Sequence, residues 1–318
     1  MRTVLALAFG LAALGFGFSS GSAAEQPTGR FVFVSDATTA ASVLWTARAD
    51  GTGARRLTRT DSVAEVEPEW SPDGRKIAYS RSDTCLADPN DLCMRIWTVN
   101  ADGSDQRRLI PLRLPGLLAN RAVSFYQPTW SSDGRQIAYE QSLWKTNRSN
   151  LYVMNADGSG RRRLTRLRNA RSPAWSPDGT AIAFTSAPEK KGADDIFILA
   201  LSTGKIRRLT STKADELLPQ WSPDGKRIAY ERWEGDDEYE VFVMNADGSS
   251  RRNLSRRRGV DGSPVWSPGG ELIAFARETE SGGEPAIFIT RADGSGRPRK
   301  VRTPTLALYE LDWTAEPR

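Results

Sequence analysis

Apolar and polar residues alternate in short runs along the whole chain, and one arrangement of these runs recurs. The phrase Pro-x-Trp-Ser-Pro-Asp-Gly-x-x-Ile-Ala-Tyr surrounds Trp70, and variants of it surround Trp130, Trp175, Trp221 and Trp266, with a shorter copy at Trp313. The spacings between these tryptophans are 60, 45, 46, 45 and 47 residues. A period of about 40 to 50 residues made of strand-like segments is typical of β-propeller blades.

Each repeat divides into four short strands. The Trp segment is followed by Ile-Ala-Tyr or Ile-Ala-Phe, then by a second phrase, which reads Leu-Tyr-Val-Met-Asn-Ala-Asp-Gly-Ser-Gly-Arg-Arg-Arg-Leu-Thr at residues 151–165. An Asp-Gly pair between two alternating segments is a strong hairpin signal, because glycine accepts the positive φ that the turn needs. We therefore interpret the repeated tryptophans as core residues, and the repeated aspartates as turn residues rather than metal ligands.

The two ends of the chain complete one blade together. The first repeat begins at residues 30–34 and lacks a Trp strand, while nothing follows the last Trp strand around Trp313. Pairing between these ends removes the open edges of the sheet array. The sequence thus predicts an all-β fold, a six-bladed β-propeller of four-stranded antiparallel blades, closed by pairing of the N- and C-terminal strands.

The first 24 residues are expected to form a signal peptide. Arg2 precedes an uncharged run of Leu, Ala, Phe and Gly, and small residues at positions 22–24 suit a signal peptidase. The run is too short for a membrane span of about 20 residues, and no later segment approaches that length. We predict a protein that is exported to the periplasm or the extracellular space, is not transmembrane, and has one propeller domain over residues 25–318. In such a compartment, Cys85 and Cys93 are expected to form a local disulfide.

The five-fold Pro-x-Trp-Ser-Pro-Asp-Gly phrase resembles the WD40-like propeller repeat of the periplasmic TolB family, and the resemblance covers nearly all of residues 25–318. It implies a TolB-like propeller that binds an envelope protein or peptide. Members of that family carry an additional N-terminal α/β domain. Because the first expected strand follows soon after Ala24, we expect that domain to be absent here.

The amino-acid composition excludes several classes of enzyme. The chain has no histidine among its 318 residues, which excludes Ser-His-Asp hydrolases, Cys-His proteases and histidine-ligated zinc sites. Propeller lyases and prolyl oligopeptidases resemble this architecture, but the former depend on histidine ligands and the latter on a separate hydrolase domain. We therefore expect a protein that is not an enzyme. The net charge of +5 does not indicate nucleic-acid binding, because no basic groove with interleaved aromatic residues is evident.

The candidate binding residues lie on the face that carries the longer loops, where sequence varies between blades. Acidic residues exceed basic ones there, which favours a partner with Lys, Arg or a free amine. The predicted contact set at the channel mouth is Glu65, Glu67, Asp215, Glu216, Asp261 and Glu310.

Three alternatives stay open. Arginine pairs recur on the fourth strand of the repeat, so a basic outer rim is expected, which either binds anionic glycans or lipid head groups or protects the edge strand from pairing. No cofactor is expected, although a weak Ca²⁺ site is an alternative at the clustered Asp and Asn residues between Asp83 and Asp91 or at residues 236–238. The resemblance also raises a weak cation site in the central channel, formed by Glu67, Glu69, Glu310 and Asp312. At the position of Glu67, three other repeats carry Gln127, Ser172 and Ser263, so this ring is not uniformly charged. The alternative function is a secreted glycan-binding or glycan-processing propeller with a carboxylate pair.

Overall fold

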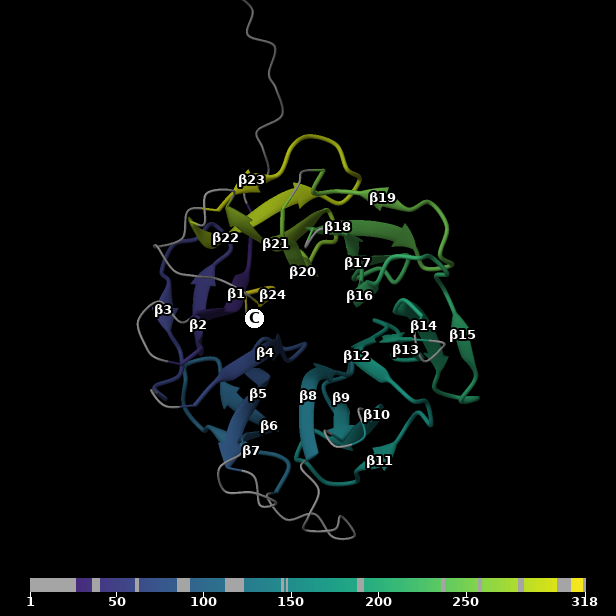
Figure 1. Ribbon diagram of the computed structural model, residues 1–318. Coiled ribbons are helices and arrows are strands. Elements are labelled where there is room, and N and C mark those ends of the chain that lie inside the picture. Colours follow the sequence, from purple (N-terminus) through teal and green to yellow (C-terminus); the bar gives the residue numbers. More distant parts are fainter. Residues whose placement is uncertain are drawn as a thin grey trace, which may run out of the picture.

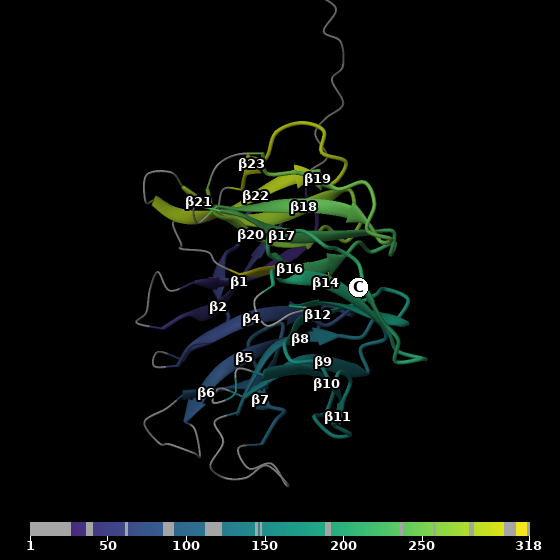
Figure 2. The same ribbon diagram turned by 45° about the vertical axis from the view of Figure 1, so that its right-hand side comes forward.

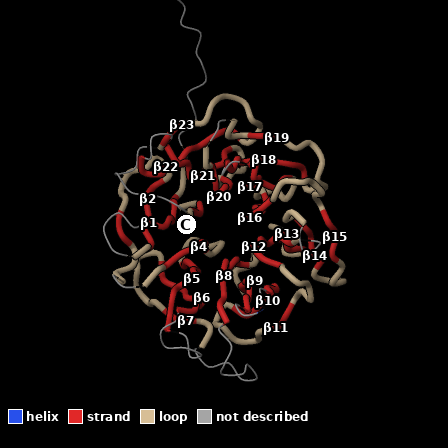
Figure 3. Tube along the Cα trace, viewed as in Figure 1, coloured by secondary structure: helices blue, strands red, loops and turns tan. Residues whose placement is uncertain are grey.

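Six four-stranded antiparallel sheets surround a common axis like the blades of a propeller (Figure 1). The computed structural model describes residues 27–35, 41–60, 63–84, 92–111, 123–143, 146, 148–187, 192–235, 238–256, 259–279, 283–301 and 310–316. Apart from a 3₁₀ residue at 146, the regular elements within these ranges are strands, as the strand and loop colouring of Figure 3 shows. The predicted all-β, six-bladed fold is confirmed.

Each blade extends from an innermost strand at the axis to a short outermost strand at the rim. In that order, blade 1 contains β24 (Leu311–Thr314), β1 (Arg30–Ser35), β2 (Val43–Arg48) and β3 (Arg55–Arg56), and blade 2 contains β4 (Glu65–Trp70), β5 (Lys76–Thr84), β6 (Leu92–Asn100) and β7 (Arg107–Arg108). Blade 3 contains β8 (Val123–Trp130), β9 (Gln136–Leu143), β10 (Arg148–Asn155) and β11 (Arg162–Arg163), and blade 4 contains β12 (Ala170–Trp175), β13 (Ala181–Ser186), β14 (Asp195–Ala200) and β15 (Ile206–Arg208). Blade 5 contains β16 (Glu216–Trp221), β17 (Arg227–Gly235), β18 (Glu238–Asn245) and β19 (Arg252–Asn253), and blade 6 contains β20 (Asp261–Trp266), β21 (Leu272–Thr279), β22 (Gly283–Arg291) and β23 (Arg299–Lys300).

The ring is closed by the two ends of the chain. Strand β24 pairs with β1 in antiparallel register from Phe33 opposite Leu311 to Arg30 opposite Thr314. Each innermost strand also contacts the innermost strands of both neighbouring blades, with β24 contacting β20 on one side and β4 on the other. Figure 2 shows the same stacking of blades from a second direction. The predicted closure by the terminal strands is confirmed.

Hydrophobic cores lie between blades. One core joins Ile96 and Leu109 of blade 2 to Phe125, Trp130 and Tyr139 of blade 3, all buried. Four of the six repeated tryptophans are buried, and Trp175 and Trp221 are partly buried against the cores of their blades. The interpretation of these tryptophans as core residues is confirmed.

In blades 2, 3 and 5 the second Asp-Gly turn does more than reverse the chain. Its glycine lies so close to the preceding blade that a Cβ atom would collide with a backbone carbonyl oxygen. The collision distances would be 2.6 Å for Gly103 with Leu57, 2.5 Å for Gly158 with Leu109 and 2.7 Å for Gly248 with Leu209. These turns therefore interlock neighbouring blades near the rim. Their aspartates cap the turn, as Asp102 does by accepting the Ser104 N–H at 2.8 Å.

Some predictions fall outside the described residues. The signal peptide over residues 1–24 and Cys85 both lie there, so the cleavage after Ala24 and the disulfide stay predictions. Cys93 is buried near the start of β6, opposite Asp83 of β5. The described part of the chain contains no helix with the length and hydrophobicity of a membrane span.

Candidate functional site

A bulge in the innermost strand shapes the mouth of the axial channel. The pairing of the first two strands shifts register in blades 2 to 6, and a non-glycine residue at the bulge has a φ of +49° to +56°. In each of these blades a proline follows it, which a bulge tolerates because the proline leaves no ladder N–H unpaired. The five left-handed residues are Glu67, Gln127, Ser172, Leu218 and Ser263.

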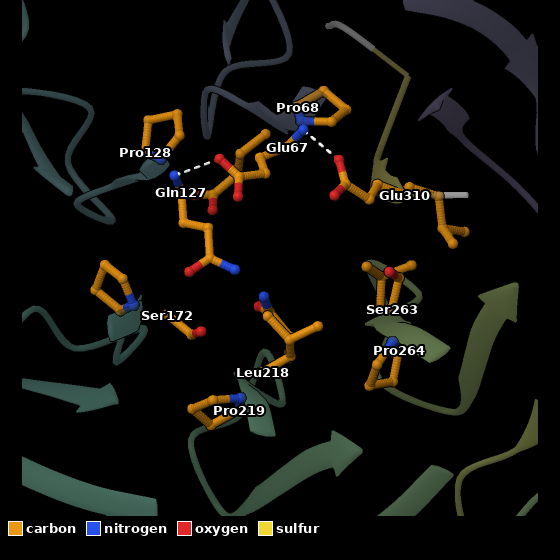
Figure 4. Close-up of a pocket in the computed structure, with 15 residues that line it drawn as sticks. Glu67, Pro68, Gln127, Pro128, Ser172, Leu218, Pro219, Ser263, Pro264 and Glu310 are labelled. Atoms are coloured by element: carbon orange, nitrogen blue, oxygen red, sulfur yellow. Dashed lines mark hydrogen bonds between the residues drawn. The ribbon is translucent and has the colours of Figure 1, made fainter. Parts of the chain in front are cut away.

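These five residues and Glu310, which occupies the same position in blade 1, line one pocket around the axis (Figure 4). The pocket encloses about 600 Å³, its open mouth included. Glu67 and Glu310 contribute carboxylates on one side, whereas Leu218 with its neighbour Pro219 contributes apolar surface on another side. The mouth is therefore polar and acidic in blades 1 and 2 and largely uncharged in blades 4 to 6.

Carboxylates at the channel hold neighbouring blades together through backbone N–H groups. Glu310 accepts the N–H of Glu67, and Glu67 in turn accepts the N–H of Gln127 at 2.7 Å and the hydroxyl of Ser80 at 2.7 Å. Two residues further along the same strands, Asp312 accepts the N–H of Trp70 at 2.7 Å, and Glu69 accepts that of Trp130 at 2.7 Å. Each acid reaches from one blade to the next, so these side chains fix the bulges in place.

Burial at the axis favours the protonated form of these acids. Desolvation, reinforced by the charge of Glu310, raises the pKa of Glu67 to about 8. Desolvation also raises the pKa of Asp312 to about 6, and it raises the pKa values of Glu69 and Glu310 above the usual range. Near neutral pH the channel therefore holds fewer negative charges than its carboxyl groups suggest.

The structure divides the predicted contact set. Glu67 and Glu310 meet at the channel mouth, and Asp215 is partly buried on the same face, where its Oδ1 accepts the Asp194 N–H at 2.7 Å. Glu65, Glu216 and Asp261 are at most 1% exposed. A partner cannot reach these three acids without local unfolding, so we exclude them as contact residues.

The three buried acids belong to a repeated arrangement inside the blades. In the strand register Glu65 faces Arg81, Glu216 faces Arg232 and Asp261 faces Arg277. The last pair is bidentate, with both nitrogen–oxygen distances 2.6 Å. Arginine and acid occur together in blades 2, 5 and 6, whereas blade 3 has Phe125 and Gln141 at the paired positions. The acids therefore serve the interior of the fold.

The outer rim carries the predicted arginines on the outermost strands, but two of them bind the neighbouring blade. Arg55 donates to the carbonyl of Ala101 at 2.9 Å, and Arg252 donates to that of Asp293. Arg256, which follows β19, donates to the carbonyl of Gly294 at 2.8 Å. These bonds tie the rim together. Binding of anionic glycans or lipid head groups at the rim stays a prediction.

The four acids proposed for a cation site in the channel lie on or beside two neighbouring innermost strands, β4 and β24. Among the described residues, no group of three or more acidic or cysteine side chains is arranged to hold a metal ion. The acids of the ring instead face backbone N–H groups of the next blade.

Sequence reasoning identified the ring position through Glu67, Gln127, Ser172 and Ser263, but it missed the left-handed bulge and the apolar contribution of Leu218. The signal was present in the sequence, because a proline stands two residues before Trp in five repeats. A proline inside an apparently central strand indicates a bulge or an edge.

Comparisons with known proteins agree with this architecture. The sequence profile of the TolB beta propeller domain matches residues 116–235. An uncharacterized protein of Agrobacterium fabrum is 28% identical over 115 residues, which cover 36% of this chain and only 37% of that protein's length. TolB from Acinetobacter baumannii superposes with a TM-score of 0.71 at 22% identity, over 92% of this chain and 68% of that one. A TolB candidate from Agrobacterium tumefaciens gives a TM-score of 0.64 at 16% identity, over 91% of this chain and 99% of that one.

Proposed function

We propose that this chain, a TolB-like six-bladed propeller, is an exported, non-catalytic binding or scaffold protein of the cell envelope. It captures a peptide segment or protein at the channel mouth on the face of the longer loops. The asymmetric ring of bulged residues is the observation that carries this proposal.

The mouth suits an extended segment with mixed chemistry. Its volume of about 600 Å³ accommodates a few side chains but no folded domain. The carboxyl oxygens of Glu67 and Glu310 on one side accept hydrogen bonds from donors such as amide, ammonium or guanidinium groups, whereas Leu218 and Pro219 favour an apolar side chain on the other. Residues at the mouth sit on strands whose bulges are fixed by hydrogen bonds, and such rigid positions lose little entropy on binding.

Two features of the chain support a non-catalytic role in an exported protein. The absence of histidine removes the commonest general base and metal ligand. The carboxylates at the mouth are engaged with backbone N–H groups, which suits a structural role better than proton transfer. Export rests on the predicted signal peptide, and mass spectrometry of the exported protein should find Glu25 as its first residue.

Quantitative capture from envelope extracts tests the mouth. The bait is residues 25–318 in three forms, namely wild type, Leu218→Arg and Thr203→Arg. Leu218→Arg places a long cation in the mouth without removing a hydrogen bond, while Thr203 is exposed at the turn between β14 and β15 and adds the same charge at the opposite face. We expect Leu218→Arg to recover at least tenfold less partner and Thr203→Arg to match wild type. Equal recovery by all three folded forms, checked by circular dichroism, would exclude the mouth as the binding site.

A further inference from the structure

A second pocket opens between blades 5 and 6, beside the channel mouth. It encloses about 570 Å³, its open side included, and its lining includes Glu231, Tyr239, Val260, Ala276, Glu278 and Pro285. Ser263 lines both this pocket and the channel mouth, so the two spaces adjoin. Most of the pocket wall is apolar, and Glu231 is the buried acid within it.

Glu231 has one carboxylate oxygen that no described residue hydrogen-bonds. The side chain is 7% exposed, and its Oε1 accepts the N–H of Ser263. Within the described part of the chain, Oε2 has no hydrogen-bond partner. Desolvation raises the pKa of this group to about 7, and the Ser263 N–H is the one group that opposes the shift.

Between blades 3 and 4 the propeller has an equivalent acid with an arginine close by. Glu140 in blade 3 stands at the position of Glu231, three residues after the Ile that faces the repeated Trp. At the following boundary, Arg171 of blade 4 stands where blade 6 has Gly262, four residues before the repeated Trp. Burial raises the pKa of Glu140 to about 7, against the opposing effects of the Ser149 hydroxyl and the Arg171 charge. The Arg171 guanidinium pairs with Asp194, and its charge acts to lower the pKa of Glu140 as well, so one arginine acts on two acids at this boundary.

At the boundary between blades 5 and 6 the arginine is absent. The residue at its position is Val66 in blade 2, Tyr126 in blade 3 and Leu217 in blade 5, and only Gly262 lacks a side chain among the described residues at this position. A Cβ atom at Gly262 would lie 2.7 Å from Glu231 Oε1. The missing side chain therefore leaves the acid open to the pocket.

We propose that this pocket binds the guanidinium group of an arginine side chain from the partner, which takes the place that Arg171 occupies between blades 3 and 4. The aliphatic stem lies along Val260, Ala276 and Pro285. The guanidinium meets Glu231 inside the pocket, and the exposed Glu278 at the rim supplies a second carboxylate, as Asp194 does for Arg171. Planar guanidinium groups pair well with two carboxylates because their donors form a fixed fork.

The pocket adjoins the mouth, so we assign the arginine to the partner segment that binds there. This assignment rests on the proposed function. The pocket itself can be tested without the partner. The probe is Nα-acetyl-arginine N-methylamide, and its citrulline analogue is an uncharged control of nearly the same shape. Binding is measured by calorimetry or by nuclear magnetic resonance titration.

We expect wild type to bind the arginine probe at least tenfold more tightly than the citrulline probe. Glu231→Gln should lose at least tenfold in affinity, because a hydrogen bond between charged groups is replaced by a weaker one. Glu140→Gln is the matched control, since it removes the equivalent acid that Arg171 already compensates, and it should bind as wild type. Equal affinity of wild type and Glu231→Gln, or equal affinity for the two probes, would overturn the proposal.

A second variant supplies the missing side chain internally. Gly262→Arg copies the residue of blade 4 at a position whose φ lies outside the left-handed region. We expect it to fold, to block the arginine probe, and to be less stable when Glu231→Gln is added. Probe binding by folded Gly262→Arg at wild-type affinity would also overturn the proposal. Leu218→Arg should leave probe affinity unchanged. Partner capture by Leu218→Arg therefore tests the proposed function, and probe binding by Glu231→Gln tests the pocket, so that either proposal can fail without the other.

Discussion

The interlock between blades can be isolated with two glycines of one blade. Gly235 and Gly248 both lie in blade 5 and both have a φ of +94°. A Cβ atom at Gly248 would lie 2.7 Å from the carbonyl oxygen of Leu209 in blade 4, whereas a Cβ atom at Gly235 would have no atom within 4 Å. Alanine at either position therefore has the same backbone strain, but only Gly248→Ala pushes two blades apart.

The difference between the two variants measures the contact. Alanine at a left-handed position costs about 1 to 2 kcal/mol, and this cost is shared by Gly235→Ala and Gly248→Ala. Forcing a methyl group into a packed contact adds about 1 to 3 kcal/mol, and it adds this only at Gly248, because the backbone oxygen of Leu209 cannot swing away as a side chain can.

Thermal unfolding followed by circular dichroism provides the assay. In a domain of this size, 1 kcal/mol corresponds to a Tm change of about 2 to 4 °C. We expect Gly248→Ala to melt at least about 3 °C below Gly235→Ala. Equal melting temperatures would refute the view that the second Asp-Gly turns interlock the blades, and would leave φ as the only reason for glycine at Gly248.

Three further predictions test the buried charges and the cysteines. Asp261→Asn should destabilise by about 3 to 5 kcal/mol in urea unfolding, because it leaves Arg277 buried without its bidentate partner, and a loss below about 1 kcal/mol would contradict this. The folded-state pKa values of about 8 for Glu67 and about 7 for Glu231 exceed the ordinary value of 4.5, so the folded state binds more protons and stability should fall as pH rises from about 5 to 8. Glu67→Gln should flatten that slope, and an unchanged slope would contradict the assignment. Cys93→Ser should cost about 2 to 3 kcal/mol under oxidising conditions, whereas equal stability of the variant and the oxidised wild type would argue against a disulfide.

The repeat was enough to predict the fold, because its signals are local. Trp70 and its five counterparts mark the innermost strands, and the Asp-Gly pairs mark the turns. Closure by β1 and β24 followed from the incomplete repeats at the two ends, and the register from Phe33 to Arg30 confirms it. Each of these inferences needs only the period of a strand or the φ of a turn.

The candidate site was harder to predict because the bulge reverses which side chains face the axis. In a regular strand Glu65 and Glu67 point to the same face, since side chains alternate with a period of two. The left-handed φ of +56° at Glu67 interrupts this alternation. Glu65 is consequently buried against blade 1, where Thr58 donates to it, while Glu67 lines the channel. Alternation alone could not separate the two residues.

Differences between repeats point to function only when the rest of the chain does not account for them. Asp261 varies between blades, yet it occurs together with Arg277 across the strand pair, so its charge is satisfied inside the protein. Glu140 also varies, and Arg171 of the next blade partly compensates it. Glu231 has the same position as Glu140 but faces Gly262 and an open pocket. A charge that differs between blades and that lacks, among the described residues, the partner found at its counterpart is therefore the stronger indication of a binding site, and Glu231 meets both conditions.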